Sequence, residues 1–130
     1  MSKMMSVPAD ELNAILWQGE YLFGCVAADG FHASEHILSP SKPHVAITEQ
    51  RIVLFSRRGI RGKRLDEEMS WPLTVFTDFI NFNEGTALEP FLYFVTLFTV
   101  DNEAVWTAFK SHRAREAFKD MVDAAFGPVL

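Results

Sequence analysis

The sequence predicts a mainly β domain (α+β by element count): seven short antiparallel strands form a strongly bent sheet or partly open barrel, and a C-terminal helix caps it. Three observations support this prediction. Apolar and aromatic runs recur at short intervals, and 12 of the 130 residues are phenylalanine, which favours strands. The connections between these runs are short, as they are between antiparallel neighbours. The chain then closes with one amphipathic helix, which can cover one opening of a bent sheet.

The first third of the chain is predicted to hold a short helix, a strand and a loop. Segment 8–17 is predicted to be the N-terminal helix, because its apolar residues share one face. The run 21–28 is predicted to be a strand that ends at the turn Asp29-Gly30. Segment 31–43 contains three serines and two prolines and is predicted to be mostly loop.

The middle of the chain alternates between apolar and polar residues, which is typical of strands. The predicted strands are 44–47, 51–56, 64–71 and 73–83. Pro72 indicates an edge or a bend, because proline cannot donate a hydrogen bond to a neighbouring strand. The alternation slips near Asp78, which indicates a bulge or a short helical turn.

The last third is predicted to form two strands and the closing helix. The strands are 91–100 and 104–110, joined by a turn at Asp101-Asn102-Glu103. Ser111 is a suitable N-cap for the helix, and Gly127-Pro128 is a suitable end. The apolar residues of the helix recur with helical spacing and are predicted to plug the sheet. The predicted plug consists of Phe118, Met121, Val122 and Phe126.

Length, charge and cysteine content limit the classes of function. A chain of 130 residues is expected to form a single domain, residues 1–130, with a self-sufficient core. The net charge of −5 argues against a surface built for nucleic acid. The sequence shows no apolar signal segment and no run of membrane-spanning length, so we expect a cytoplasmic protein. Cys25 is the single cysteine and is expected to be buried and inert.

Two short motifs resemble those of the bacterial pleckstrin-homology-like (PH-like) and GRAM domains. Gly19-Glu20 precedes the first predicted strand, and Ile47-Thr48-Glu49-Gln50-Arg51 continues into the apolar run 52–55. The resemblance covers residues 12–126 and includes the closing helix. It implies a seven-stranded, strongly bent barrel that acts as a binding or assembly module rather than as an enzyme. Fold alone does not define function.

One departure from this pattern limits what the resemblance implies. Phosphoinositide-binding members of the wider superfamily place lysine and arginine along their first two strands and in the loop between them. Segment 20–28 contains neither residue, and the following loop offers Lys42 alone. We therefore do not expect binding of inositol phosphates.

A basic run is the strongest local feature of the sequence. Six of the 12 cations lie between Arg51 and Arg64, and the remaining 6 stand against 17 acidic residues. One interpretation is a solvated hairpin tip that Asp66-Glu67-Glu68 neutralises. The others are contact with a protein or a second copy, attraction to anionic lipid, and contact with nucleic acid, which the lack of interleaved aromatics disfavours. The candidate contact residues are Arg57, Arg58, Ile60, Arg61, Lys63 and Arg64.

No other residues form a recognisable catalytic, metal-binding or cofactor-binding motif. His32 and His36 stand four apart, with His44 further along, but their segment is rich in serine and proline, which disfavours a shared metal. We expect no enzymatic activity and no cofactor.

Together these observations predict a non-enzymatic binding or self-assembly module that contacts a protein partner or further copies of itself. The expected route is pairing at a free sheet edge, or docking of the basic run on an acidic face. Recruitment to an anionic membrane through residues 57–64 is the alternative. A small-ligand carrier is less favoured and would need an elongated pocket lined by polar groups.

Overall fold

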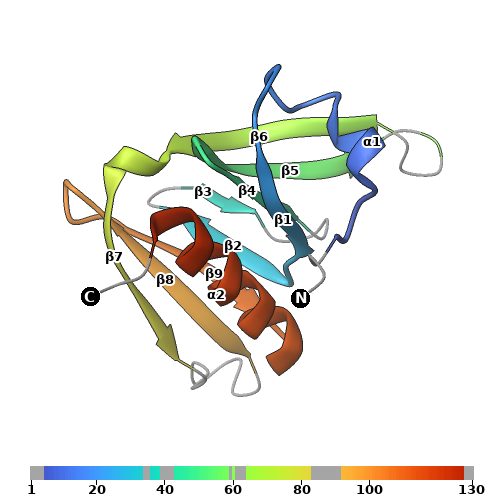
Figure 1. Cartoon of the computed structure of the whole chain (residues 1–130). Coiled ribbons are helices and arrows are strands. Elements are labelled where there is room, and N and C mark those ends of the chain that lie inside the picture. Colours follow the sequence, from blue (N-terminus) through green and yellow to red (C-terminus); the bar gives the residue numbers. More distant parts are fainter. Residues whose placement is uncertain are drawn as a thin grey trace.

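The computed structural model describes residues 5–33, 36–38, 43–58, 60, 64–82 and 92–127. These residues form nine β-strands, two α-helices and a short 3₁₀ helix (Figure 1). In chain order the elements are α1 (Ala9–Leu12), β1 (Leu22–Ala27), β2 (Gly30–Ala33), β3 (His36–Leu38), β4 (His44–Thr48), β5 (Arg51–Arg58), β6 (Arg64–Pro72), η2 (Leu73–Val75), β7 (Phe76–Phe82), β8 (Tyr93–Thr99), β9 (Ala104–Phe109) and α2 (His112–Phe126).

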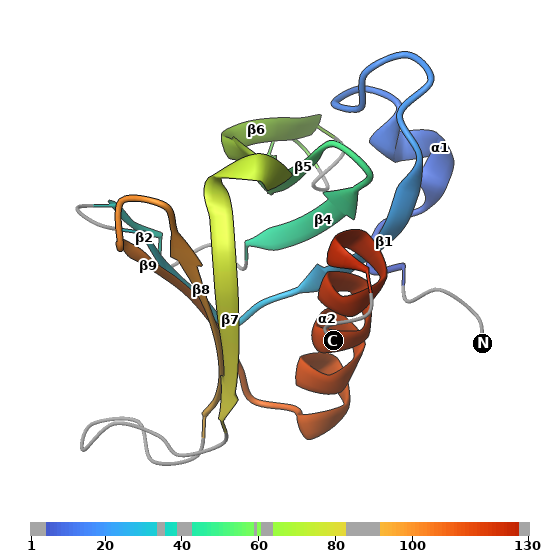
Figure 2. The same cartoon turned by 60° about the vertical axis from the view of Figure 1, so that its left-hand side comes forward.

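The strands form two antiparallel sheets that stand at an angle to each other (Figure 2). The first sheet has the order β1-β4-β5-β6, and the second has the order β3-β2-β9-β8-β7. Every pairing between neighbouring strands is antiparallel. The prediction of a mainly β, antiparallel fold with a closing helix is therefore confirmed.

The predicted number of strands is wrong, and so is the predicted loop over 31–43. The described part of the chain has nine strands rather than seven, because β2 and β3 form within that segment. Phe31 of β2 lies opposite Leu38 on β3 and opposite Thr107 on β9. This pairing on both sides holds the short strand extended, although the segment that contains it is rich in serine and proline. The described strands also form two separate sheets rather than one closed barrel.

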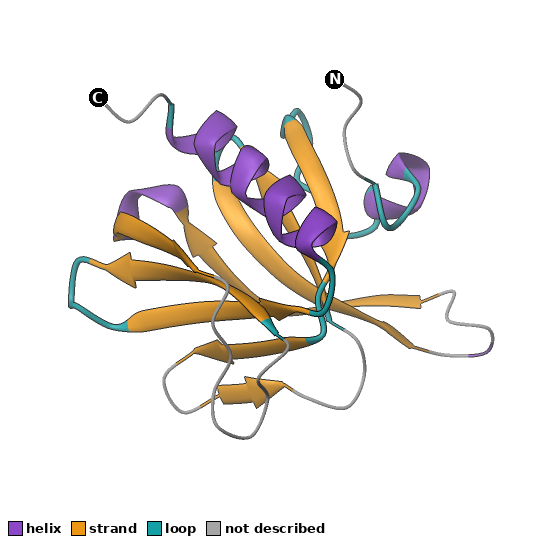
Figure 3. Ribbon diagram, turned by 90° about the horizontal axis from the view of Figure 1, so that it is seen from below, coloured by secondary structure: helices purple, strands orange, loops and turns teal. Residues whose placement is uncertain are grey.

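The main core lies between the two sheets and beneath α2, which contacts both of them (Figure 3). On α2, Phe118, Met121 and Val122 are buried, and Phe126 is partly buried against the same cluster. The ring of Phe118 packs 5.5 Å from that of Phe109 on β9, measured between centroids. The apolar stripe of the helix therefore faces the sheets rather than solvent.

The closing helix begins and ends at the residues that the sequence indicates. Ser111 accepts a hydrogen bond on its Oγ from the backbone N–H of Ala114 at 3.2 Å. Gly127 follows the helix with a φ of 79°, a conformation that residues with a side chain rarely adopt. Neither helix in the described part of the chain has the length and apolar character needed to cross a membrane.

A second, smaller core lies on the outer face of the first sheet. Val7 and Leu12 are fully buried there against Cys25, Val53 and Phe55. The N-terminal segment thus covers the sheet from outside, beside β5 and β6 (Figure 1). As a consequence, β4 is buried at all five of its positions.

The N-terminal helix is shorter than predicted. The sequence predicts a helix over 8–17, but α1 ends at Leu12 and turns follow it. The carbonyl of Ile15 accepts a hydrogen bond from Arg51 at 2.8 Å, so this tertiary contact takes the place of a further helical turn.

Candidate functional site

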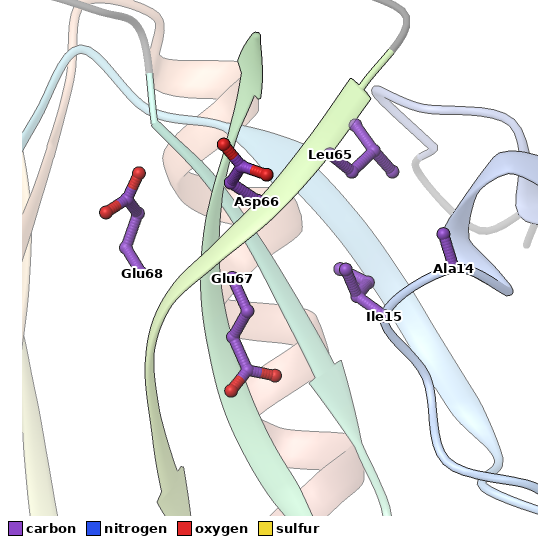
Figure 4. A pocket seen from close by; sticks show the side chains of 6 residues that line it. All are labelled: Ala14, Ile15, Leu65, Asp66, Glu67 and Glu68. Carbon is purple, nitrogen blue, oxygen red and sulfur yellow. The ribbon is translucent and has the colours of Figure 1, made fainter.

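An open groove runs along β6, the last strand of the first sheet (Figure 4). Its volume is about 650 Å³. Consecutive side chains of β6 line one part of it, and the turn after α1 lines the other. The lining residues are Ala14, Ile15, Leu65, Asp66, Glu67 and Glu68. The groove therefore combines a strand edge, a short apolar wall and a row of carboxylates.

The three carboxylates of the groove have different partners. Glu67 is 40% exposed and accepts a hydrogen bond from Nη1 of Arg51 at 2.7 Å. Asp66 pairs with Arg64 at 3.2 Å, and Glu68 accepts a hydrogen bond of 2.6 Å from a buried serine of β5. Of the two cations among these partners, Arg51 is buried and Arg64 is exposed.

Arg51 holds the wall of the groove in place. Its Nε and Nη2 donate to the two carboxylate oxygens of Glu20, at 2.9 and 3.2 Å, and Nη2 also donates to the carbonyl of Ile15 at 2.8 Å. The ring of Trp17 lies over the guanidinium, 3.9 Å from Cζ to the ring centroid. Because Nη1 binds Glu67, one buried cation joins the turn after α1 to β5 and β6.

Burial and hydrogen bonding act in opposite directions on this ion pair. Burial raises the pKa of Glu20, but hydrogen bonds from Arg51, Thr48 and the Trp17 backbone outweigh it, and the pKa lies below its usual value. Burial likewise lowers the pKa of Arg51, but its bonds to Glu20 and Glu67 outweigh that effect and raise it. Both side chains therefore stay charged at neutral pH.

The two motifs behind the family resemblance meet at this ion pair. Thr48 donates through Oγ1 to Glu20 at 2.7 Å and accepts from the backbone N–H of Arg51 at 3.1 Å. Gly19 has a φ of 79°, so a glycine suits the turn that presents Glu20. Both motifs thus help to fix the segment before β1 on the hairpin of β4 and β5. The sequence identified the motifs but not their contact.

Two exposed aromatic side chains lie in the segment between α1 and β1. Trp17 is 54% exposed and Tyr21 is 52% exposed. One face of Trp17 covers Arg51, which in turn binds Glu67, so the Trp17 ring adjoins the acidic lining. Tyr21 packs edge-on against Phe23, with centroids 5.2 Å apart. Sequence analysis missed this surface because nothing in the local pattern separates these aromatics from core residues.

The basic run lies on two strands and their connection. Arg57 on β5 forms an ion pair with Glu11 of α1, and Arg64 on β6 forms one with Asp66. Ile60 is 87% exposed. Arg57 and Arg64 are thus each bound to a carboxylate of the same chain. Outside the described residues lie Arg61, Lys63 and the side chain of Arg58.

Cys25 belongs to a polar cluster that the sequence does not indicate. The Oγ of Ser6 lies 3.1 Å from Sγ of Cys25 and 2.9 Å from Nδ1 of His44. Burial raises the pKa of Cys25 to about 11, and burial with the charge of Arg57 lowers the pKa of His44. A protonated thiol beside a neutral imidazole is not an activated nucleophile, so this cluster is structural.

Of the three histidines considered as metal ligands, His44 lies on the first sheet, whereas β2 and β3, which carry His32 and His36, belong to the second. His32 on β2 stacks on Trp106 with centroids 5.1 Å apart, and His44 on β4 stacks on Phe55 at 5.3 Å. Within the described ranges, no three His, Cys, Asp or Glu residues are arranged to hold a metal. The side chain of His36 lies outside these ranges.

A second pocket lies where edge strand β7 meets the end of α2. Its volume is about 240 Å³. Three of its six lining residues are phenylalanine, and Thr77 and Asp78 are its two polar lining residues, so it lacks the convergent polar groups that a small-ligand carrier requires. The lining residues are Phe76, Thr77, Asp78, Phe79, Leu97 and Phe126.

No family model matches the sequence, and no curated protein matches it.

Solved structures, in contrast, are similar to it. A structure of Vav1 with an allosteric inhibitor aligns with a TM-score of 0.63 at 10% identity over 94% of this chain, which spans 30% of the Vav1 chain. A pleckstrin-homology domain from Shewanella amazonensis aligns with a TM-score of 0.52 at 18% identity, over 92% of this chain and 86% of that one. A DUF1696 family protein with a pleckstrin-homology domain from Shewanella loihica aligns with a TM-score of 0.52 at 18% identity, over 90% of this chain and 89% of that one. At these identities the similarity shows a PH-like fold alone, and similarity to GRAM domains stays a prediction.

Proposed function

We propose that this chain is a non-enzymatic interaction module that binds a second polypeptide along the outer edge of β6. The observation that carries this proposal is the groove of about 650 Å³ beside the terminal strand of the first sheet. A terminal strand directs some of its backbone N–H and C=O groups away from its neighbour, and an extended segment can pair with them.

Two other roles draw less support from the described residues. Recruitment to an anionic membrane through 57–64 would use Arg57 and Arg64, but each is paired with a carboxylate, and the acidic groove lies beside them. Self-assembly would use the same strand edge or the same charged segment. It predicts a mass in solution that rises with concentration, which light scattering at low salt measures.

Site-specific photo-crosslinking tests the proposed function. A photo-reactive amino acid replaces Ala14, an exposed residue of the groove, in the organism that makes this protein. Ala124, an exposed residue on α2, is the matched control. We expect a protein adduct of defined mass from position 14 and none from position 124. Equal labelling at both positions, or adducts with lipid alone, would reject the proposal.

A further inference from the structure

We infer that the N-terminal segment, residues 5–12, is a pH-sensitive cover of the first sheet, which protonation of His44 releases. The inference concerns β1 and the surface buried beneath this segment rather than binding in the β6 groove, so it goes beyond the proposed function. Three features carry it: how the segment is attached, where His44 lies, and which charges surround the imidazole.

The segment lies along one edge of β1 and over the outer face of the sheet. Among the described strands, β1 pairs with β4 on one side, and Met5 forms a parallel bridge to Cys25 on β1. The backbone N–H of Ser6 donates to the carbonyl of Cys25 at 3.0 Å. Val7 and Leu12 are fully buried in the smaller core. The segment therefore covers both a strand edge and an apolar surface.

His44 lies beneath this cover. Side chains alternate along a strand, so His44 shares the outer face of β4 with Ala46 of the smaller core. The imidazole is buried, stacks on Phe55 at 5.3 Å between centroids, and has its Nδ1 2.9 Å from the Oγ of Ser6. The same Oγ lies 3.1 Å from Sγ of Cys25, a thiol that its pKa of about 11 keeps protonated. One serine of the segment thus joins the imidazole to β1.

The charges around His44 favour the neutral ring. Burial and the positive charge of Arg57 on β5 hold the pKa of His44 below its usual value of 6.5. Glu11 of α1 is paired with Arg57. Glu67 on β6 stands beyond the ring stacked on His44, in the register of β5 and β6, and is bound to Arg51. Each of these two carboxylates therefore has an arginine partner already, and an imidazolium would be buried beside a cation.

The direction of the pH effect follows from this burial. When the segment leaves, water reaches His44 and its pKa returns toward 6.5, so the released form binds a proton more readily than the covered form. The cover is therefore held fully above pH 6.5 and is weakened as the pH falls below 6.5 toward the pKa of the covered form. Because one proton is taken up, the ratio of released to covered protein rises by at most about tenfold per pH unit.

The cover can open without unfolding the rest of the domain. Its fully buried residues belong to the smaller core, whereas the two sheets and α2 enclose the main one. The pair of Arg57 and Glu11 is partly exposed on both sides, and such pairs contribute little to stability. Peripheral units of this kind open at a lower free energy than the whole domain. Release uncovers the edge of β1 and the side chains of Cys25, Val53 and Phe55.

Hydrogen exchange of the full chain, followed by NMR between about pH 7.5 and 5.5, tests this inference. Protection factors are corrected for the intrinsic pH dependence of exchange. Below pH 6.5 we expect the protection of the Ser6 amide to fall by up to about tenfold per pH unit. The amide of Val95, on β8 in the middle of the second sheet, should keep its protection.

Two variants assign the effect to His44. His44→Asn keeps a polar group beside Ser6 but does not titrate, so the pH dependence at Ser6 should disappear. His112→Asn removes an imidazole that is 60% exposed on α2, and the pH dependence should remain.

Three results would overturn the inference: constant protection at Ser6 across this pH range, the same loss in His44→Asn, or an equal loss at Val95, which would mean that acid unfolds the whole domain. If His44→Asn does not fold, the imidazole C–H resonances of the natural protein decide. A pKa of His44 at or above 6.5 would then reject the inference, whereas a lower pKa with loss confined to the segment supports it.

Discussion

Arg51 and Glu20 form a two-point ion pair in which neither side chain is more than 2% exposed. The two residues are 31 positions apart, and the hydrogen-bond distances are 2.9 and 3.2 Å. Arg51 also binds Glu67, so this pair connects the core of the first sheet to the acidic groove. It therefore links stability to the geometry of the candidate site.

Removing one partner of this pair should be strongly destabilising. Glu20→Gln leaves the Arg51 charge buried without its counter-charge, and we expect a loss of about 3–5 kcal/mol in the free energy of unfolding. The double variant Glu20→Gln/Arg51→Met should lose less than the sum of the two single variants, because neither charge is then left alone. Urea titration measures all four proteins. Additive losses would show that the two side chains do not interact.

The ion pair should also make stability depend on pH in acid. The pKa of Glu20 is lowered in the folded state from 4.5, so unfolding makes this carboxyl easier to protonate. Its contribution is fully present above pH 4.5 and is lost as the pH falls through the folded pKa. We expect the stability difference between the natural protein and Glu20→Gln to shrink below pH 4.5. Urea titrations of both proteins at intervals of about one pH unit measure this difference. A difference that stays constant down to about pH 2 would contradict the prediction.

Cys25 should be unreactive in the folded protein. Its pKa is raised from 9.0 to about 11, so the thiolate is scarce at neutral pH and the sulfur is also buried. A thiol reagent at pH 8 should label the unfolded chain rapidly and the folded chain at the rate of unfolding.

The same shift predicts a loss of stability in alkali. The unfolded thiol ionises near pH 9.0 and the folded one near 11, so this contribution is complete below 9.0 and is lost as the pH rises. The loss is about 3 kcal/mol, from about two pKa units. Cys25→Ala should lack this decline. An identical alkaline decline in both proteins would assign it to other groups.

Phe118 should contribute more to stability than any surface ion pair. It is fully buried between α2 and β9, and Phe118→Ala is expected to cost about 3–5 kcal/mol. Asp120→Ala on the exposed side of the same helix should change stability by less than about 0.5 kcal/mol. Thermal and urea unfolding measure both. A neutral Phe118→Ala would mean that the helix is not docked on the sheets.

The N-terminal segment should be an integral part of the domain. Leu12 is fully buried in the smaller core on the outer face of the first sheet, and Leu12→Ala should cost about 2–5 kcal/mol. Hydrogen exchange at Ala46 and Val53 should accelerate in this variant, because they lie beneath the segment. Unchanged exchange would indicate that the segment contributes no cover.

The elements that the sequence predicted well depend on residues close together in the chain. The closing helix is an example, since its cap at Ser111, its apolar spacing and its end at Gly127 are all local. The turn after β8 is another, because Asn102 has a φ of 64°, which asparagine tolerates better than most residues. Antiparallel strands with short connections followed from the same local signals.

Tertiary structure alone decided the rest. β2 and β3 are extended because of the strands beside them, and the apolar outer face of the first sheet is buried because the N-terminal segment covers it. The acidic groove needs Arg51 to contact Ile15 and Glu67, which are 36 and 16 positions away. Propensity and periodicity act over a few residues, whereas the burial and ion pairing that build this site act between segments that folding brings together.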